Sequence, residues 1–176
     1  NILYIIYIIM CKKDIYNLRL SNVTHQGNLN LVSLNADKSE YTIQIPESIR
    51  RKGKCTLTVS DIHIQIKNNT GTSIVPANSH TALVEVEGLN LLGFSNQNAS
   101  NPVCLAVMGI DSNKNDIRLD SPGSSVFSCL DIAPTLTIKR LVYNPASPFL
   151  PIPMNGQTTD VVPMIINLQL EFFEDM

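Results

Sequence analysis

The sequence predicts an all-β domain with antiparallel strands, and three observations support this fold class. Segments of about five to eight residues with alternating apolar and polar side chains recur along the chain, with turn-forming residues between them. No stretch of about 11 or more residues keeps apolar side chains at helical spacing between helix caps. The strand-like segments lie about 8 to 15 residues apart with some long connections, which favours a Greek-key sandwich or jelly roll over tight hairpin meanders.

The first element is an apolar segment, Ile2 to Met10, that carries no charge. A helix that crosses a bilayer needs roughly 20 apolar residues, and this run is about half as long. It lacks the preceding positive charge and the following small-residue cleavage site of a secretory signal. Its isoleucines and tyrosines favour extended structure. We therefore expect an N-terminal arm over residues 1–14 that covers another chain or a membrane. In the alternative, translation starts at Met10 and residues 1–9 are not part of the protein.

The segment CTLTVSDIHIQIKN, residues 55–68, predicts the clearest strand. Apolar residues alternate with polar ones, and the phase of the alternation changes at Ser60 and Asp61. One long strand with a β-bulge, or two strands that meet at a bend, would produce this change. The segment VCLAVMGI, residues 103–110, is apolar on both faces and predicts a central strand.

The last strand is predicted in MIINLQLEFFED, residues 164–175, where every second residue is apolar. The residues predicted to face the core are Ile166, Leu168, Leu170 and Phe172, and those predicted to face away are Asn167, Gln169 and Glu171. Weaker patterns predict six more strands, at residues 15–20, 29–34, 41–45, 82–86, 126–132 and 136–143. We expect about nine strands in a single domain over residues 15–176.

The segment NPASPFLPIPMNGQTTDVVP, residues 144–163, holds half of the ten prolines. Prolines at this spacing exclude helix and central strand and stiffen the chain in an extended form. Phe149, Leu150, Ile152 and Met154 lie between them and make the segment unusually apolar for a loop. We expect it to contact another subunit. The alternative is a lid that folds back over one end of the sandwich.

Charge is low: 16% of residues are charged, against a usual ~25%, and the net charge is −2. This excludes a protein that binds nucleic acid through the electrostatic field of its overall charge. A neutral polar surface suits a protein that assembles. The cluster RRKGK includes Arg50, Arg51 and Lys52 and lies between two predicted strands. It predicts either a solvated hairpin tip or a contact to an acidic partner surface or a packaged genome.

Residues for chemistry are few. The cysteines at positions 11, 55, 104 and 129 form no CxxC motif, so we expect reduced thiols in the core. Asp111, Asn113 and Asn115 begin like a calcium loop, but the pattern then fails, which leaves a polar turn. His63 is expected at the surface or an interface. The sequence shows no local catalytic or nucleotide-binding motif, and we expect no catalytic residue, no metal and no cofactor.

The bulged strand CTLTVSDIHIQIKN, the segment NPASPFLPIPMNG and the closing strand IINLQLEFFED together resemble the layout of a single jelly-roll capsid protein. Such proteins form pentons or minor capsid components in large double-stranded DNA viruses and virophages. The resemblance covers residues 15–176 and implies an antiparallel eight-stranded jelly-roll sandwich that functions by self-assembly in the capsid shell of the virion, after assembly in the host cytoplasm.

The partners that this resemblance implies are copies of the chain itself, as a pentamer, and other capsid proteins. Residues 1–10 would reach a neighbouring subunit or an internal membrane, and neither a specific nucleic acid nor a small-molecule substrate is expected. The interface hypothesis comprises Ile2, Tyr4, Tyr7, Arg50, Arg51, Lys52, Phe149, Leu150, Ile152 and Met154.

The competing class is a ligand-binding β-sandwich module, either carbohydrate-binding or cytokine-like and trimeric. Sugar-binding modules of this kind use exposed aromatic rings, and here tryptophan is absent and aromatic residues make up only 6% of the chain. Tyr4, Tyr7, Tyr41 and Tyr143 remain as candidate platforms.

Overall fold

The computed structural model describes residues 13–36, 38–92, 102–119, 125–144, 147–154 and 161–173. These residues form ten strands, all paired antiparallel, and one short helix, which confirms the predicted all-β class. The elements are β1 (Lys13–Ser21), β2 (Leu31–Leu34), β3 (Glu40–Gln44), α2 (Glu47–Arg50), β4 (Cys55–Gln65), β5 (Thr81–Leu91), β6 (Val103–Gly109), β7 (Asp116–Leu119), β8 (Ser125–Asn144), β9 (Ser147–Pro153) and β10 (Met164–Phe173).

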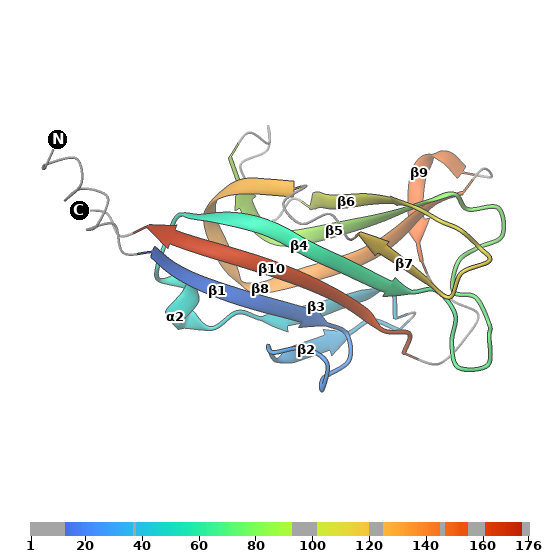
Figure 1. Ribbon diagram of the computed structural model, residues 1–176, viewed down its shortest axis with the longest axis horizontal. Coiled ribbons are helices and arrows are strands. Elements are labelled where there is room, and N and C mark those ends of the chain that lie inside the picture. Colours follow the sequence, from blue (N-terminus) through green and yellow to red (C-terminus); the bar gives the residue numbers. More distant parts are fainter. Residues whose placement is uncertain are drawn as a thin grey trace, which may run out of the picture.

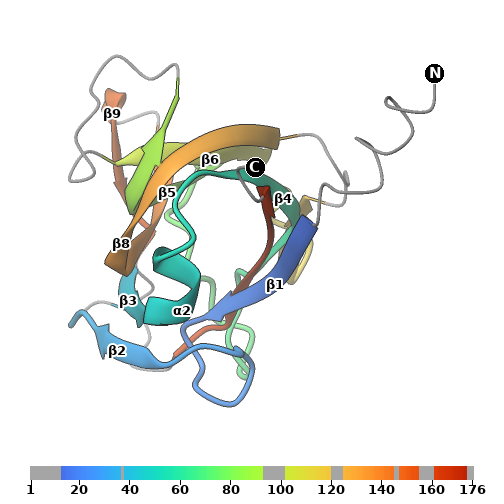
Figure 2. The same ribbon diagram turned by 90° about the vertical axis from the view of Figure 1, so that its left-hand side faces the viewer.

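The strands form one strongly curled sheet, whose main path runs β1-β10-β4-β8-β3-β2 (Figures 1 and 2). The inward-facing side chains fill its interior with a single apolar core. The described residues form ten strands, more than the eight of the expected jelly roll, and two of them, β2 and β7, are short, with four residues each.

The long strand β8 organises the sheet. One of its edges pairs with β5, and the other pairs in turn with β4, β3 and β9. The sequence predicted two strands here, separated by a gap around Pro134, whereas the structure has one bent strand. Pro134 lies in a bulge between the β4 and β3 ladders, and its carbonyl accepts a hydrogen bond from the Ile45 N–H at 2.9 Å. Proline is tolerated at such a bulge because its missing N–H is not needed there.

Gly88 of β5 makes this bulge possible. Its φ is +100°, and a Cβ atom at this position would lie 2.5 Å from the carbonyl oxygen of Thr135. Residues with a side chain rarely adopt this backbone conformation, and the close approach leaves no room for one. The bend of β8 therefore depends on a glycine in the neighbouring strand.

Two predicted strands are confirmed in detail. β4 is a single strand whose register shifts opposite Asn167 and Leu168, with Ser60 as the extra residue, so the bulge alternative is correct. In β10, the four residues predicted to face the core are each at most 4% exposed: Ile166, Leu168, Leu170 and Phe172. The polar residues between them are partly exposed.

The prediction that β6 is central is wrong. Within the described residues β6 pairs only with β5, and its Val107 is 61% exposed. A register shift between Val84 and Glu85 leaves Leu105 as an extra residue, so that Leu105 and Ala106 are both buried. The unbroken apolar run is thus explained by a bulge on an edge strand and not by burial of both faces.

Candidate functional site

The cationic cluster lies at the end of α2 and is not a hairpin tip, because β3 and β4 do not pair with each other. They lie along different stretches of the same edge of β8, and α2 connects them. The carbonyl of Pro46 accepts hydrogen bonds from the N–H groups of Ile49 and Arg50, and the buried side chain of Ile49 anchors the turn. Gly53, with φ +76°, then reverses the chain into β4.

Two of the three predicted cations at this turn are engaged within the chain. Arg51 forms an ion pair with Glu47 at 2.6 Å, and both side chains are exposed. The Lys52 ammonium pairs with Asp14 of β1 and lies 5.6 Å from the centre of the Tyr16 ring. The hydrogen bond with Asp14 raises the pKa of Lys52. The Lys52 contacts connect the turn to β1, and the two ion pairs leave less positive charge for an acidic partner than the sequence indicated.

The proline-rich segment is extended, as its prolines predicted, but part of it is a strand and not a loop. β9 pairs with the end of β8, where Leu141 is opposite Pro153 and Val142 opposite Ile152. The interface hypothesis is wrong for Met154, because its side chain is fully buried in the chain's own core. Its N–H donates a hydrogen bond to the carbonyl of Arg140 at 2.8 Å. The side chains of Phe149, Leu150 and Ile152 lie outside the described part of the structure.

The hypothesised interface residues do not come together in one place. The cationic turn at α2 and the proline strand β9 lie at opposite ends of the long axis (Figure 1). Ile2, Tyr4 and Tyr7 lie outside the described residues. A contact that used both the turn and β9 would therefore need two neighbours, or one neighbour that extends along the long axis.

Sequence reasoning missed a set of exposed apolar side chains on edge strands. Ile15 on β1 is 50% exposed, Val32 on β2 is 56% exposed, and Val107 on β6 is 61% exposed. Within the described residues each of these strands has a neighbour on one side only. One signal was present in the sequence: in the two-residue period of the strand, Ile15 falls on the face opposite to the buried Leu18 and Leu20. The alternation therefore placed Ile15 on the outer face, even though the strand partners were unknown.

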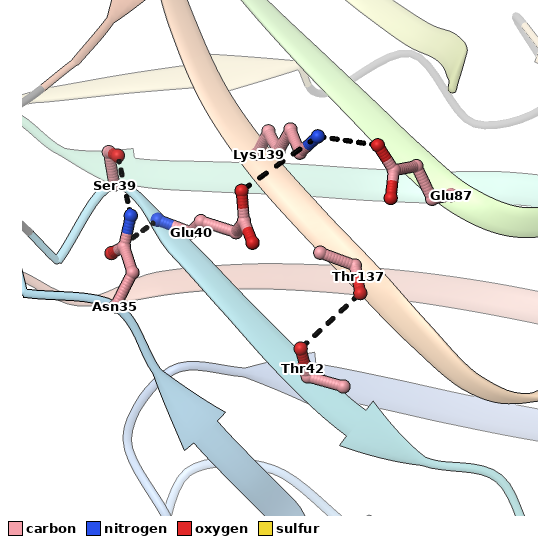
Figure 3. Close-up of polar contacts among 7 residues, drawn as sticks. All are labelled: Asn35, Ser39, Glu40, Thr42, Glu87, Thr137 and Lys139. Carbon is pink, nitrogen blue, oxygen red and sulfur yellow. Dashed lines mark hydrogen bonds and ion pairs between the residues drawn. The ribbon is translucent and has the colours of Figure 1, made fainter. Parts of the chain in front are cut away.

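Across the middle of the sheet, polar side chains bind one another (Figure 3). Lys139 of β8 pairs with Glu87 of β5 and lies 3.8 Å from Glu40 of β3. The Thr42 and Thr137 hydroxyls are 3.3 Å apart across the β3–β8 ladder. These cross-strand contacts stabilise the sheet, and their charges are largely paired within the chain.

His63 takes the predicted surface position. Its side chain is 30% exposed, while its neighbours Ile62 and Ile64 are buried. Its Nε2 lies 2.9 Å from the Asp116 carboxylate of β7, which also accepts a hydrogen bond from Arg118 at 3.0 Å. Arg118 first, and then His63, lower the pKa of Asp116. The contact ties the short strand β7 to β4.

The polar segment after β6 forms a turn, as expected. The Asp111 carboxylate accepts a hydrogen bond from the Asn113 N–H at 3.0 Å, an arrangement typical of Asx turns. Within the described residues no group of three or more His, Cys, Asp or Glu side chains is placed to hold a metal ion. The described part of the chain also contains no helix with the length and apolar character to span a membrane.

Fold and site together define an all-β protein with a curled antiparallel sheet and apolar side chains exposed along its edges. No protein-family model matches the chain, and no curated protein matches it in sequence.

Among solved structures, the chain is similar to the mavirus penton protein, with 11% identity and a TM-score of 0.34 over 81% of this chain and 57% of that chain. It is also similar to the CBM22-1 and GH10 modules of a Clostridium thermocellum endo-1,4-beta-D-xylanase 10B complexed with xylohexaose. That match has 9% identity and a TM-score of 0.30, over 92% of this chain and 25% of that chain. Likenesses this distant carry no argument about function.

Proposed function

We propose that the chain is a structural capsid protein that acts by self-assembly and inter-subunit contacts, as a penton (vertex) or minor capsid protein with a jelly-roll fold. In this role it forms a closed ring, with five copies as the expected number, or one subunit of a larger shell. Its location is then the capsid shell of the virion, after assembly in the host cytoplasm.

One observation carries this proposal: Ile15, Val32 and Val107 are exposed on strands that have a free edge within the described residues. A free edge offers unpaired backbone N–H and C=O groups to another chain, and soluble monomers usually protect such edges with charges or prolines. Edges with apolar β-branched side chains favour association instead. Low overall charge reduces the electrostatic repulsion between copies.

The mass in solution tests the proposal. We expect light scattering at high micromolar concentration to report an oligomer for the purified protein, alone or mixed with its capsid partners. Val107→Lys should weaken this association, because it places a charge beside the outer edge of β6. The matched control is Tyr143→Lys, since Tyr143 is also exposed (38%) but lies where β8 pairs with β5 on one side and with β9 on the other. A strict monomer under both conditions, or equal effects of the two variants, would count against the proposal.

Residues 1–10 lie outside the described structure, and the proposal gives them a contact with a neighbouring subunit or an internal membrane. Deleting residues 1–9 should then leave the melting temperature unchanged while it weakens assembly or binding to lipid vesicles. Loss of several degrees of stability would instead show that these residues belong to the chain's own fold.

The alternative, a ligand-binding module, is favoured by a pocket of about 550 Å³ beside the 72–80 loop. Its polar lining includes Ser73, Asn78 and His80, but its described lining has no Phe, Tyr or Trp side chain. Tyr41, a candidate platform in the sequence, is 1% exposed and cannot stack on a sugar. A glycan array separates the two classes, because the capsid proposal expects no binding.

A further inference from the structure

Two free cysteines that are far apart in the sequence face each other in the sheet. Cys55 at the start of β4 is directly opposite Cys129 of β8 in an antiparallel ladder. Directly opposed residues in such ladders have Cα atoms about 4.5 to 5.5 Å apart, and disulfides form across Cα distances of about 4.4 to 6.8 Å. The two thiols lie close enough that each shifts the pKa of the other. The backbone therefore already holds the pair at the spacing that a disulfide requires.

The place of this pair in the sheet gives a bond there a structural effect. Among the described strands, the β4–β8 ladder is the only one that joins the group β1, β10, β4 and β7 to the remaining six strands. A covalent link between Cys55 and Cys129 would fasten the two parts of the curled sheet at this ladder. It would also close a long loop that contains β5, β6 and β7, and closure of a long loop reduces the entropy of the unfolded chain most.

A pocket lies beside the pair. It has a volume of about 690 Å³, within the usual range for small-molecule sites, and both cysteines line it together with Lys52 and Lys54. Lys52 is already paired with Asp14, so the ammonium group of Lys54 would attract an anionic reagent such as glutathione disulfide, which carries carboxylates.

We propose that Cys55 and Cys129 are a dithiol site that forms a reversible cross-strand disulfide, with a small anionic disulfide of the glutathione type as the oxidant. In the first step the thiolate of one of the two cysteines attacks one sulfur of the small disulfide, forms a mixed disulfide and releases one thiolate. In the second step the other cysteine loses its proton to solvent and attacks the sulfur of the first cysteine, which releases the second thiolate. The two protein thiols are oxidised by two electrons, and the small disulfide is reduced to two thiols.

Geometry supports both steps. Both cysteines line the pocket, so the small disulfide can approach either sulfur, and the cysteine directly opposite then resolves the mixed disulfide.

The test uses the full chain under native conditions. The protein is equilibrated in glutathione buffers from fully reduced to fully oxidised, free thiols are alkylated, and peptides are mapped by mass spectrometry without reduction. We expect two thiols to disappear together, a peptide pair that joins Cys55 to Cys129, and reversal by dithiothreitol. The oxidised form should melt about 5 to 10 °C higher than the reduced form.

Cys104→Ser is the matched control, because Cys104 is free, half-buried and on β6, away from the pair. This variant should form the same disulfide, whereas Cys55→Ser should stop at a mixed disulfide on Cys129. The wild-type peptide map decides the question even if Cys55→Ser does not fold. The proposal is overturned if Cys55 and Cys129 stay fully alkylated in oxidised glutathione, if the linked peptides contain other cysteines, or if a stable glutathione adduct accumulates on the wild type.

Discussion

Gly88→Ala tests whether the close approach of β5 to the bulge of β8 shapes the curled sheet. A non-glycine residue at φ +100° costs about 1–2 kcal/mol in backbone strain. The new Cβ would also lie 2.5 Å from the Thr135 carbonyl oxygen and 3.0 Å from Leu136 Cδ2, so the two strands must separate. Overpacking of this kind costs about 1–3 kcal/mol. We expect Gly88→Ala to lower the free energy of unfolding by about 2–5 kcal/mol in total.

Gly53→Ala is the matched control. Gly53 also has a positive φ, +76°, but a Cβ atom there would meet nothing within 4 Å, so only the backbone strain of about 1–2 kcal/mol remains. The effect of each substitution on the entropy of the unfolded chain is the same and cancels in the comparison. Urea unfolding followed by far-UV circular dichroism gives both values. Equal losses for the two variants, or a loss below about 0.5 kcal/mol for Gly88→Ala, would refute the described bulge.

Three further predictions test the register and the charged contacts. Leu168→Ala should cost about 2–5 kcal/mol because Leu168 is buried, whereas Gln169→Ala should change stability by less than about 0.5 kcal/mol; similar losses in urea would contradict the register of β10. The folded-state pKa of Asp116 is lowered, so its contribution to stability is present above its unfolded pKa of about 3.9 and is lost as the pH falls through the folded-state value. Thermal melts of Asp116→Asn should therefore lose less stability than wild type between about pH 5 and pH 2, and parallel curves would argue against the contact. Lys139→Met should destabilise the protein at low salt, because it leaves Glu40 and Glu87 without their shared cation, and the loss should shrink in about 1 M salt; a salt-independent loss would indicate that packing and not charge is responsible.

The proposed assembly and the Cys55–Cys129 disulfide differ in how much of each could be predicted from the sequence. Low charge and apolar segments indicated association, yet Val107, the most exposed apolar side chain of the three edge strands, lies in a run that predicted a central strand. The two cysteines carried no local motif at all. Their proximity follows from the antiparallel register of β4 and β8, which no spacing in the sequence encodes.

The sequence by itself determined most of the strand segments and, in β4 and β10, which face is buried, but it did not predict the strands β7 and β9. Alternation along β10 and the change of phase at Ser60 are local consequences of the two-residue period of a strand, so they can be interpreted without knowing any partner. Only the tertiary structure decided which strands are neighbours: that β6 is an edge strand, that β8 continues through Pro134, and that Met154 lies in the chain's own core. These features depend on hydrogen bonds and contacts between residues far apart along the chain. From an apolar residue in a strand pattern one can predict that its side chain is buried, but not which other residues it packs against.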